Sequence, residues 1–257
     1  MFESIGEKRG VTFSYVDTSD IELVRKSIRK ETKALYIETP SNPTMKVTDF
    51  ATMRKIADEY GLLIIADNTF LTPYFQKPLT LGADLVVHSG TKFLGGHNDV
   101  LAGFVCIKGK GISEKLRYTY KTVGCCLPPF DSFLVLRGIK TLSVRLERQQ
   151  ENAKKIALWL KDRPEVKAVY YTGLPEHPGY EINQKQASGC GSMISFKVDS
   201  EKRARKLLES VKLISYAESL GGVESLITYP MLQTHGDVPV ETRERLGITE
   251  DFLRMSV

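Results

Sequence analysis

The sequence predicts an α/β fold in which a mostly parallel sheet domain is followed by a smaller α+β domain. Apolar runs of strand length alternate with helical patterns over residues 11–88, and these runs are nearly continuous rather than alternating. Such runs are typical of parallel strands that are covered on both faces. After residue 129 the pattern changes to one long helical stretch followed by short strands, which predicts the second domain.

The elements of the first domain can be placed in chain order. The predicted strands cover residues 11–16, 34–37, 62–66 and 84–88. Ser19 or Asp20 can cap a first helix, and a second helix runs from Thr48 to a stop at Gly61. A further helix-like stretch ends near Gly82.

The second domain begins with a helical pattern over residues 132–161, which predicts one long helix, either straight or kinked. Strands at 167–171, 192–198 and 213–217 and a helix at 201–211 follow. We place the boundary near residue 137, which gives domains 1–137 and 138–257.

Composition excludes several classes of function. The net charge is +5, but acidic residues are interleaved with the basic ones and no basic stripe carries stacking aromatics, so we expect no nucleic-acid partner. The four cysteines and four histidines lack metal-ligand spacing, so we expect no metal. No apolar run approaches membrane length and no signal peptide is recognisable, so we expect a cytoplasmic protein without a membrane partner.

Two charged residues stand at the ends of neighbouring predicted strands. Asp67 ends the run 62–66, and Lys92 follows the run 84–88. Open α/β sheets bind ligands at such strand ends. A lysine beside Ser89 and Thr91, with a carboxylate on the next strand, suits pyridoxal 5′-phosphate (PLP). The amine can bond to the PLP aldehyde, and the carboxylate can keep the pyridine nitrogen protonated.

Five motifs extend this pattern along the whole chain. They are residues 38–43 (Glu-Thr-Pro-Ser-Asn-Pro), 67–70 (Asp-Asn-Thr-Phe), 89–92 (Ser-Gly-Thr-Lys), 218–225 (Glu-Ser-Leu-Gly-Gly-Val-Glu-Ser) and 253–257 (Leu-Arg-Met-Ser-Val). In this order and at these separations they closely resemble the PLP-dependent enzymes of Cys/Met metabolism. That family includes cystathionine γ-synthase, cystathionine γ-lyase, cystathionine β-lyase and methionine γ-lyase. The resemblance implies a type I PLP-dependent transferase fold.

The resemblance implies cofactor contacts for five residues. Lys92 would hold PLP through its amine and, once substrate displaces it, would move protons at the substrate Cα. Asp67 would bond to the pyridine nitrogen, and Ser89 and Thr91 would donate hydroxyl hydrogen bonds to the phosphate. Asn42 would touch the cofactor hydroxyl.

The resemblance also implies the substrate contacts. Arg254 would grip the α-carboxylate with its planar guanidinium, supported by Ser219 and Asn42. Glu218 would line the distal part of the pocket, where a glutamate favours the γ-synthase and γ-lyase members. The expected reaction is elimination or γ-replacement on cystathionine, an O-acylated homoserine with cysteine, or a related sulfur amino acid.

Other readings stay open at this point. Cystathionine β-lyase and methionine γ-lyase are alternatives within the family, and an aminotransferase or cysteine desulfurase would keep the cofactor but change the reaction. Family chains extend further at both ends, so the chain is expected to be a fragment lacking the N-terminal region and the extreme C-terminus. A truncated chain that binds PLP or associates with related chains without turnover is therefore a further alternative. The resemblance implies a homotetramer, built as a dimer of dimers.

Overall fold

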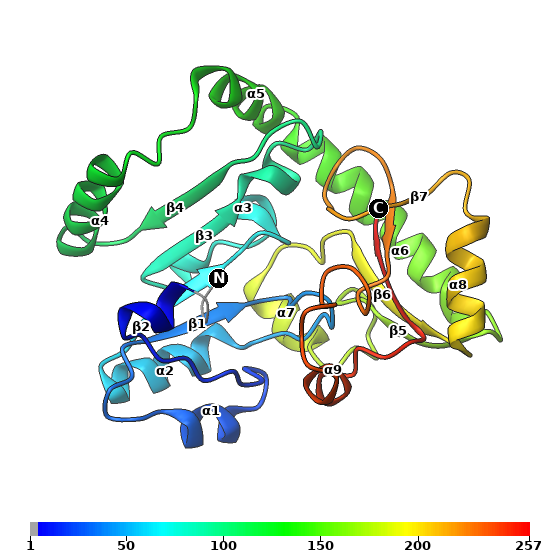
Figure 1. Cartoon of the computed structure of the whole chain (residues 1–257), viewed down its shortest axis with the longest axis horizontal. Helices are drawn as coiled ribbons and strands as arrows, with labels where there is room; N and C mark the ends of the chain where they lie inside the picture. Colours follow the sequence, from blue (N-terminus) through cyan, green and yellow to red (C-terminus); the bar gives the residue numbers. More distant parts are fainter. Residues whose placement is uncertain (1–4) are drawn as a thin grey trace.

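Two sheets organise the computed structural model, which describes residues 5–257 (Figure 1). The first sheet has the order β1-β2-β3-β4, and the second has the order β5-β6-β9-β8-β7. The strands are β1 (Ala34–Glu38), β2 (Leu63–Asp67), β3 (Leu85–Ser89), β4 (Gly103–Ile107), β5 (Val166–Tyr170), β6 (Met193–Val198), β7 (Ser215–Tyr216), β8 (Leu226–Thr228) and β9 (Phe252–Ser256).

Helices surround both sheets. They are α1 (Ile21–Ser27), α2 (Phe50–Tyr60), α3 (Thr72–Phe75), α4 (Lys110–Val123), α5 (Pro129–Ile139), α6 (Leu142–Lys161), α7 (Tyr180–Gln186), α8 (Glu201–Ser210) and α9 (Val240–Leu246), with single turns η2 (Glu7–Arg9), η3 (Pro78–Thr80) and η4 (Gly90–Leu94). Within residues 5–257, none of these helices combines the length and the apolar character that a membrane crossing requires.

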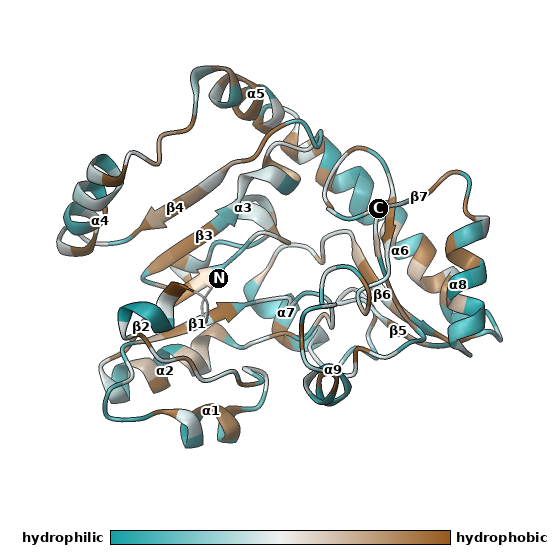
Figure 2. Ribbon diagram, viewed as in Figure 1, coloured by the Kyte–Doolittle hydropathy of each residue, from teal (hydrophilic) through white to brown (hydrophobic). Residues whose placement is uncertain are grey.

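The sequence-based prediction of a mostly parallel first sheet is confirmed. β1, β2 and β3 run parallel, and β4 pairs antiparallel with β3. One face buries Ile37, Ile64 and Val86 against α1 and α2. Figure 2 shows β3 as hydrophobic along its length and hydrophilic at its carboxyl end.

The opposite face of this sheet is less covered than the continuous apolar runs predict. Tyr36 of β1 is 41% exposed and Val105 of β4 is 49% exposed. Both residues lie on the face that carries Asp67. Tyr36 is two residues before Glu38 on β1, so the two share a face, and Glu38 pairs in register with Asp67. Val87 pairs with both Asp67 and Val105, which places Val105 on this face as well. The expectation that both faces are covered is therefore wrong for the described part of the chain.

The predicted strand at 11–16 is wrong. These residues form no sheet pairing, and β1 is hydrogen-bonded to β2 alone among the described strands. Val11 and Tyr15 are both about half exposed, so the apolar positions of this segment do not form a buried face. A strand needs a neighbouring strand to pair its backbone groups, and sequence periodicity does not supply one.

The predicted long helix over 132–161 is two helices. α5 ends at Ile139 and α6 begins at Leu142. Arg145 donates to the carbonyl of Gly138 at 2.9 Å and to the carbonyl of Phe93 at 2.9 Å. The Gly138 carbonyl also accepts from the Thr141 amide at 3.2 Å and from the Thr141 hydroxyl at 3.1 Å, so a turn and two side chains satisfy it in place of a continued helix.

The remaining predicted elements are confirmed within a few residues. Asp20 caps α1 by accepting from the Leu23 amide, and Gly61 ends α2 in the left-handed conformation. The stretch predicted to be helical before Gly82 forms the short elements α3 and η3. The chain passes from β4 to β5 through α4, α5 and α6, and the domain boundary near residue 137 stays a prediction.

Candidate active site

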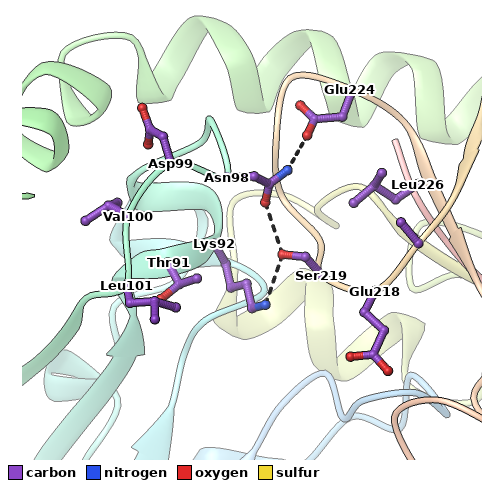
Figure 3. A pocket seen from close by; sticks show the side chains of 11 residues that line it. Thr91, Lys92, Asn98, Asp99, Val100, Leu101, Glu218, Ser219, Glu224 and Leu226 are labelled. Atoms are coloured by element: carbon purple, nitrogen blue, oxygen red, sulfur yellow. Dashed lines mark hydrogen bonds between the residues drawn. The ribbon is translucent and has the colours of Figure 1, made fainter.

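The site begins where β3 ends. The turn η4 follows β3 directly, and the fully buried side chain of Phe93 anchors it in an apolar cluster that also contains Leu146 and Leu220. At Lys92 the backbone departs from helical geometry, with φ −92° and ψ −127°. The Lys92 side chain reaches the loop before β8, where Nζ donates to Ser219 Oγ at 3.1 Å (Figure 3).

A cavity of about 670 Å³ surrounds this contact. It is lined by the 91–101 segment on one side and by the loop before β8 on the other (Figure 3). Four predicted site residues line it together, namely Thr91, Lys92, Glu218 and Ser219. The structure therefore brings together residues that lie more than 120 positions apart in sequence.

The surroundings of Lys92 favour its neutral form. Burial lowers the pKa of Lys92, and the positive charge of Arg254 lowers it further, whereas the carboxylate of Glu218 opposes both effects. A lysine amine is nucleophilic only when neutral. At a given pH, the lowered pKa therefore gives Lys92 a larger neutral fraction than an exposed lysine has.

Asp67 and Ser89 lie on one face of the first sheet and are linked through Thr69. Thr69 donates its amide and its hydroxyl to Asp67 Oδ1, at 3.0 and 2.6 Å, and the Ser89 amide donates to Thr69 Oγ1 at 2.9 Å. Tyr36 donates its hydroxyl to Asp67 Oδ2 at 3.3 Å. Within residues 5–257, no cationic side chain forms an ion pair with Asp67.

Arg254 is buried in the middle of the second sheet, on β9, and is 1% exposed. Its Nη1 donates to Asn42 Oδ1 at 2.8 Å, and its Nη2 donates to the Ser219 carbonyl and to Thr228 Oγ1, both at 2.9 Å. Burial lowers the pKa of Arg254 to about 10, against the opposing charges of Glu218 and Glu38. The guanidinium is thus charged at neutral pH, and its buried Nε has no hydrogen-bond partner among the described residues.

Glu38 supports this arrangement from the end of β1. Its Oε2 accepts the Asn42 amide at 3.0 Å, which holds the loop that presents Asn42 to Arg254. Burial raises the pKa of Glu38 to about 7; the Asn42 amide and Arg254 oppose this rise, and the charge of Asp67 adds to it. Glu38 begins the 38–43 motif, but its role is not predicted from the sequence.

Several supporting residues were missed from the sequence. Ser219 donates to Asn98 Oδ1 at 3.0 Å, and Asn98 Nδ2 donates to Glu224. Asn98 lies in the run Gly-Gly-His-Asn-Asp at 95–99, a pattern that predicts only a turn. The hydroxyl of Thr91 donates to the Ala102 carbonyl at 3.3 Å, and its oxygen accepts from the Ala102 amide at 3.1 Å. The phosphate role of Thr91 stays a prediction.

The residues present fit PLP. Asp67 has neutral hydrogen-bond donors but no cationic partner in the described part of the chain, which suits a protonated pyridine nitrogen. Lys92 offers an amine of lowered pKa at the cavity. The unpartnered Nε of Arg254 suits a further acceptor such as a carboxylate. Among residues 5–257 there is no cluster of three or more side chains that could hold a metal ion.

Comparisons with known proteins identify the family. The model for the Cys/Met metabolism PLP-dependent enzymes matches residues 1–257. A cystathionine gamma-lyase of Bacillus subtilis (strain 168) is 51% identical over 248 residues, which are 96% of this chain and 65% of that relative. A cystathionine beta-lyase of Coxiella burnetii (strain RSA 493 / Nine Mile phase I) is 46% identical over 260 residues, which cover 100% of this chain and 67% of that relative.

The fold agrees with these sequence matches. The crystal structure of a cystathionine gamma synthase from Xanthomonas oryzae pv. oryzae has a TM-score of 0.96 to this chain at 38% identity, covering 100% of this chain and 66% of that one. This chain thus spans about two thirds of the length of the relatives that it matches. Both the predicted fold and the resemblance drawn from the five motifs are confirmed. The chain belongs to the family of Cys/Met metabolism PLP-dependent enzymes.

Proposed function

We propose that this chain carries a PLP site at which the carbon–sulfur or carbon–oxygen bond of an amino acid is broken. The observation that supports this most directly is the partly buried Lys92 amine, which has a lowered pKa and faces a cavity of about 670 Å³. The guanidinium of Arg254 donates to the backbone carbonyl of Ser219, the residue whose hydroxyl accepts from Lys92. An amine nucleophile on the cavity, with a buried guanidinium bonded to the wall residue Ser219, suits an α-amino acid.

Each residue would contribute one physical task. The bound cofactor would withdraw electrons from the bonds at the substrate Cα. Asp67 would hold the proton on the pyridine nitrogen, and Ser89 would donate to the phosphate. Thr91 would donate to it as well once its single hydroxyl hydrogen turns away from the Ala102 carbonyl. Arg254 would fix the substrate carboxylate, and Asn42 holds that guanidinium in place. Lys92 Nζ, once released, would accept the Cα proton and return it during the reaction.

The substrate class that we propose is a sulfur amino acid or an O-acylated homoserine. Glu218 lies in the cavity wall and supports γ-synthase or γ-lyase chemistry. Cystathionine β-lyase is the main alternative, since a relative of that name is 46% identical. Methionine γ-lyase is a further alternative within the family.

We also propose that copies of this chain associate. Large apolar side chains on α4 and α5 are exposed, among them Tyr118 at 73%, Phe130 at 69% and Leu136 at 64%. Patches of this kind commonly mark protein interfaces. The family resemblance favours a dimer of dimers, and an associating chain without turnover is the alternative.

Borohydride reduction of the chain with PLP, followed by peptide mass mapping, tests the site. We expect a reduced adduct on the peptide that contains Lys92 and none there in Lys92→Ala. Lys46 serves as an internal control because it pairs with Asp17 outside this cavity, so that Lys46→Ala should leave Lys92 labelling unchanged. A folded chain that labels surface lysines but never Lys92 would contradict the proposed cofactor site.

A further inference from the structure

A hydrogen-bond chain leads from Lys92 to two residues that have no assigned role. Ser219 Oγ accepts from Lys92 Nζ at 3.1 Å and donates to Asn98 Oδ1 at 3.0 Å (Figure 3). Asn98 Nδ2 then donates to Glu224. A serine hydroxyl has a single hydrogen, so donation to Asn98 leaves Ser219 able only to accept from Lys92.

Asn98 is an exposed residue, but its loop packs closely on the opposite loop. Asn98 has a φ of 51° and Ser219 a φ of 84°, so both residues adopt left-handed backbone conformations where their loops meet. A Cβ atom at Gly222 would lie 2.5 Å from Asn98 Nδ2, which shows how closely the opposite loop packs on the amide. An ionised carboxylate can only accept hydrogen bonds, so Glu224 bonds to Nδ2 of the Asn98 amide. The Oδ1 end of that amide then faces Ser219.

We propose that Asn98 is a positioning residue that directs the lone pair of Lys92 into the cavity. With its hydrogen committed to Asn98, Ser219 accepts an N–H of Lys92 and cannot donate to the amine nitrogen. The nitrogen lone pair therefore remains available. This inference rests on the proposed function, because it concerns the reaction of Lys92 with the cofactor aldehyde.

The step that depends on this orientation is a condensation. The Lys92 nitrogen forms a bond to the aldehyde carbon, both amine hydrogens leave the nitrogen, and the carbonyl oxygen departs with two hydrogens as water. A carbon–nitrogen double bond replaces the carbon–oxygen double bond, and nothing is oxidised or reduced. A hydrogen bond from Ser219 to the lone pair would have to break before this attack could occur.

Asn98→Gly tests the proposal, because glycine tolerates a φ of 51° and removes only the side chain. Apo protein is mixed with excess PLP, and the rate of adduct formation on Lys92 is followed by absorbance and by mass mapping after reduction. We expect the rate to fall about tenfold, the effect of one ordinary hydrogen bond on the reacting nitrogen. The wild-type amide orientation is retained in the control Lys46→Ala, which should react at the wild-type rate.

Two further variants separate positioning from a merely structural role. In Asn98→Gly/Ser219→Ala the misdirected hydroxyl is absent, so this double variant should react no more slowly than Ser219→Ala alone. In Asn98→Asp/Glu224→Gln the acceptor for Ser219 is kept and the amide is moved to residue 224, so the rate should return to within about twofold of wild type.

The outcomes are distinct. A wild-type rate in Asn98→Gly would overturn the inference while leaving the proposed function intact. Independent, additive losses in Asn98→Gly and Ser219→Ala would also overturn it, because they would show that Asn98 does not act through Ser219. A wild-type chain that forms no Lys92 adduct would overturn the proposed function, and this inference with it.

Discussion

Arg254 and Asn42 are separated by 212 positions in the sequence, yet Arg254 Nη1 donates to Asn42 Oδ1 at 2.8 Å. The arginine belongs to β9 in the second sheet, and the asparagine follows β1 in the first. A buried, charged side chain thus joins the two sheets at the place where we propose that a substrate carboxylate binds. Substitutions here are expected to affect both stability and binding.

Arg254→Lys should weaken the binding of an amino-acid substrate about tenfold or more, because an ammonium cannot reproduce the planar guanidinium. It should also lower the free energy of unfolding by about 2 kcal/mol, since Thr228 Oγ1 and the Ser219 carbonyl compete for fewer donors. Denaturant unfolding and the KM of the loaded protein measure the two effects. Arg148→Lys, at an exposed ion pair on α6, is the control and should change neither.

Glu38→Gln should change how stability depends on pH. Burial raises the pKa of Glu38 to about 7, so the folded state holds this proton more tightly than the unfolded state does. The stabilisation that comes from this proton is therefore fully present below the ordinary glutamate pKa and is lost as the pH rises to about 7. The free energy of unfolding falls by about 3 kcal/mol at most over this range. Denaturant unfolding curves measured from about pH 4 to about pH 8 should show this decline in wild type and not in Glu38→Gln. Parallel declines in both would contradict the assignment.

Glu218→Gln should move the reactivity of Lys92 to lower pH. The carboxylate of Glu218 opposes the lowering of the Lys92 pKa by burial and by Arg254, so removing its charge lowers that pKa further. The midpoint of PLP adduct formation against pH reports the change. Glu209→Gln, on the exposed surface of α8, is the matched control and should leave the midpoint where it is. A midpoint that moves to higher pH in Glu218→Gln would refute this account.

Gly221→Ala should destabilise the fold more than Gly124→Ala does. Both glycines have a φ of 76°, which costs an alanine about 1 kcal/mol. A Cβ atom at Gly221 would lie 2.7 Å from the Phe93 amide nitrogen, whereas at Gly124 it would meet nothing within 4 Å. The clash adds about 1–3 kcal/mol at Gly221 alone. Equal losses in urea unfolding would show that contact with η4 is unimportant.

The central parts of the fold and site follow from local patterns. Apolar runs ended by Asp67 and followed by Lys92 predict strands β2 and β3 and place both charges at one edge of the sheet, because parallel strands end together. Caps at Asp20 and Gly61 predict α1 and α2 because their chemistry is local. The roles of the eight predicted site residues stay predictions, although the structure connects them in two groups.

The remaining features depend on contacts between distant segments. Asn98 and Glu224 are 126 positions apart, and each lies in a loop whose composition predicts a turn and no partner. At the break between α5 and α6, Arg145 reaches the carbonyl of Phe93, a residue 52 positions away, as well as that of Gly138. The segment 11–16 has a strand pattern without a neighbouring strand. None of these three outcomes can be obtained from periodicity within one segment.

The central position of β9 divides the site into a fixed part and an adjustable part. β9 is hydrogen-bonded to β6 on one side and to β8 on the other, so Arg254 cannot shift without breaking sheet pairing. Glu218 stands instead in the loop before β8, where a new side chain disturbs no strand. Protein engineering that seeks a different leaving group should therefore vary position 218 and keep Arg254. If the proposed function holds, such libraries should change the distal half of the substrate and keep the recognition of an amino acid.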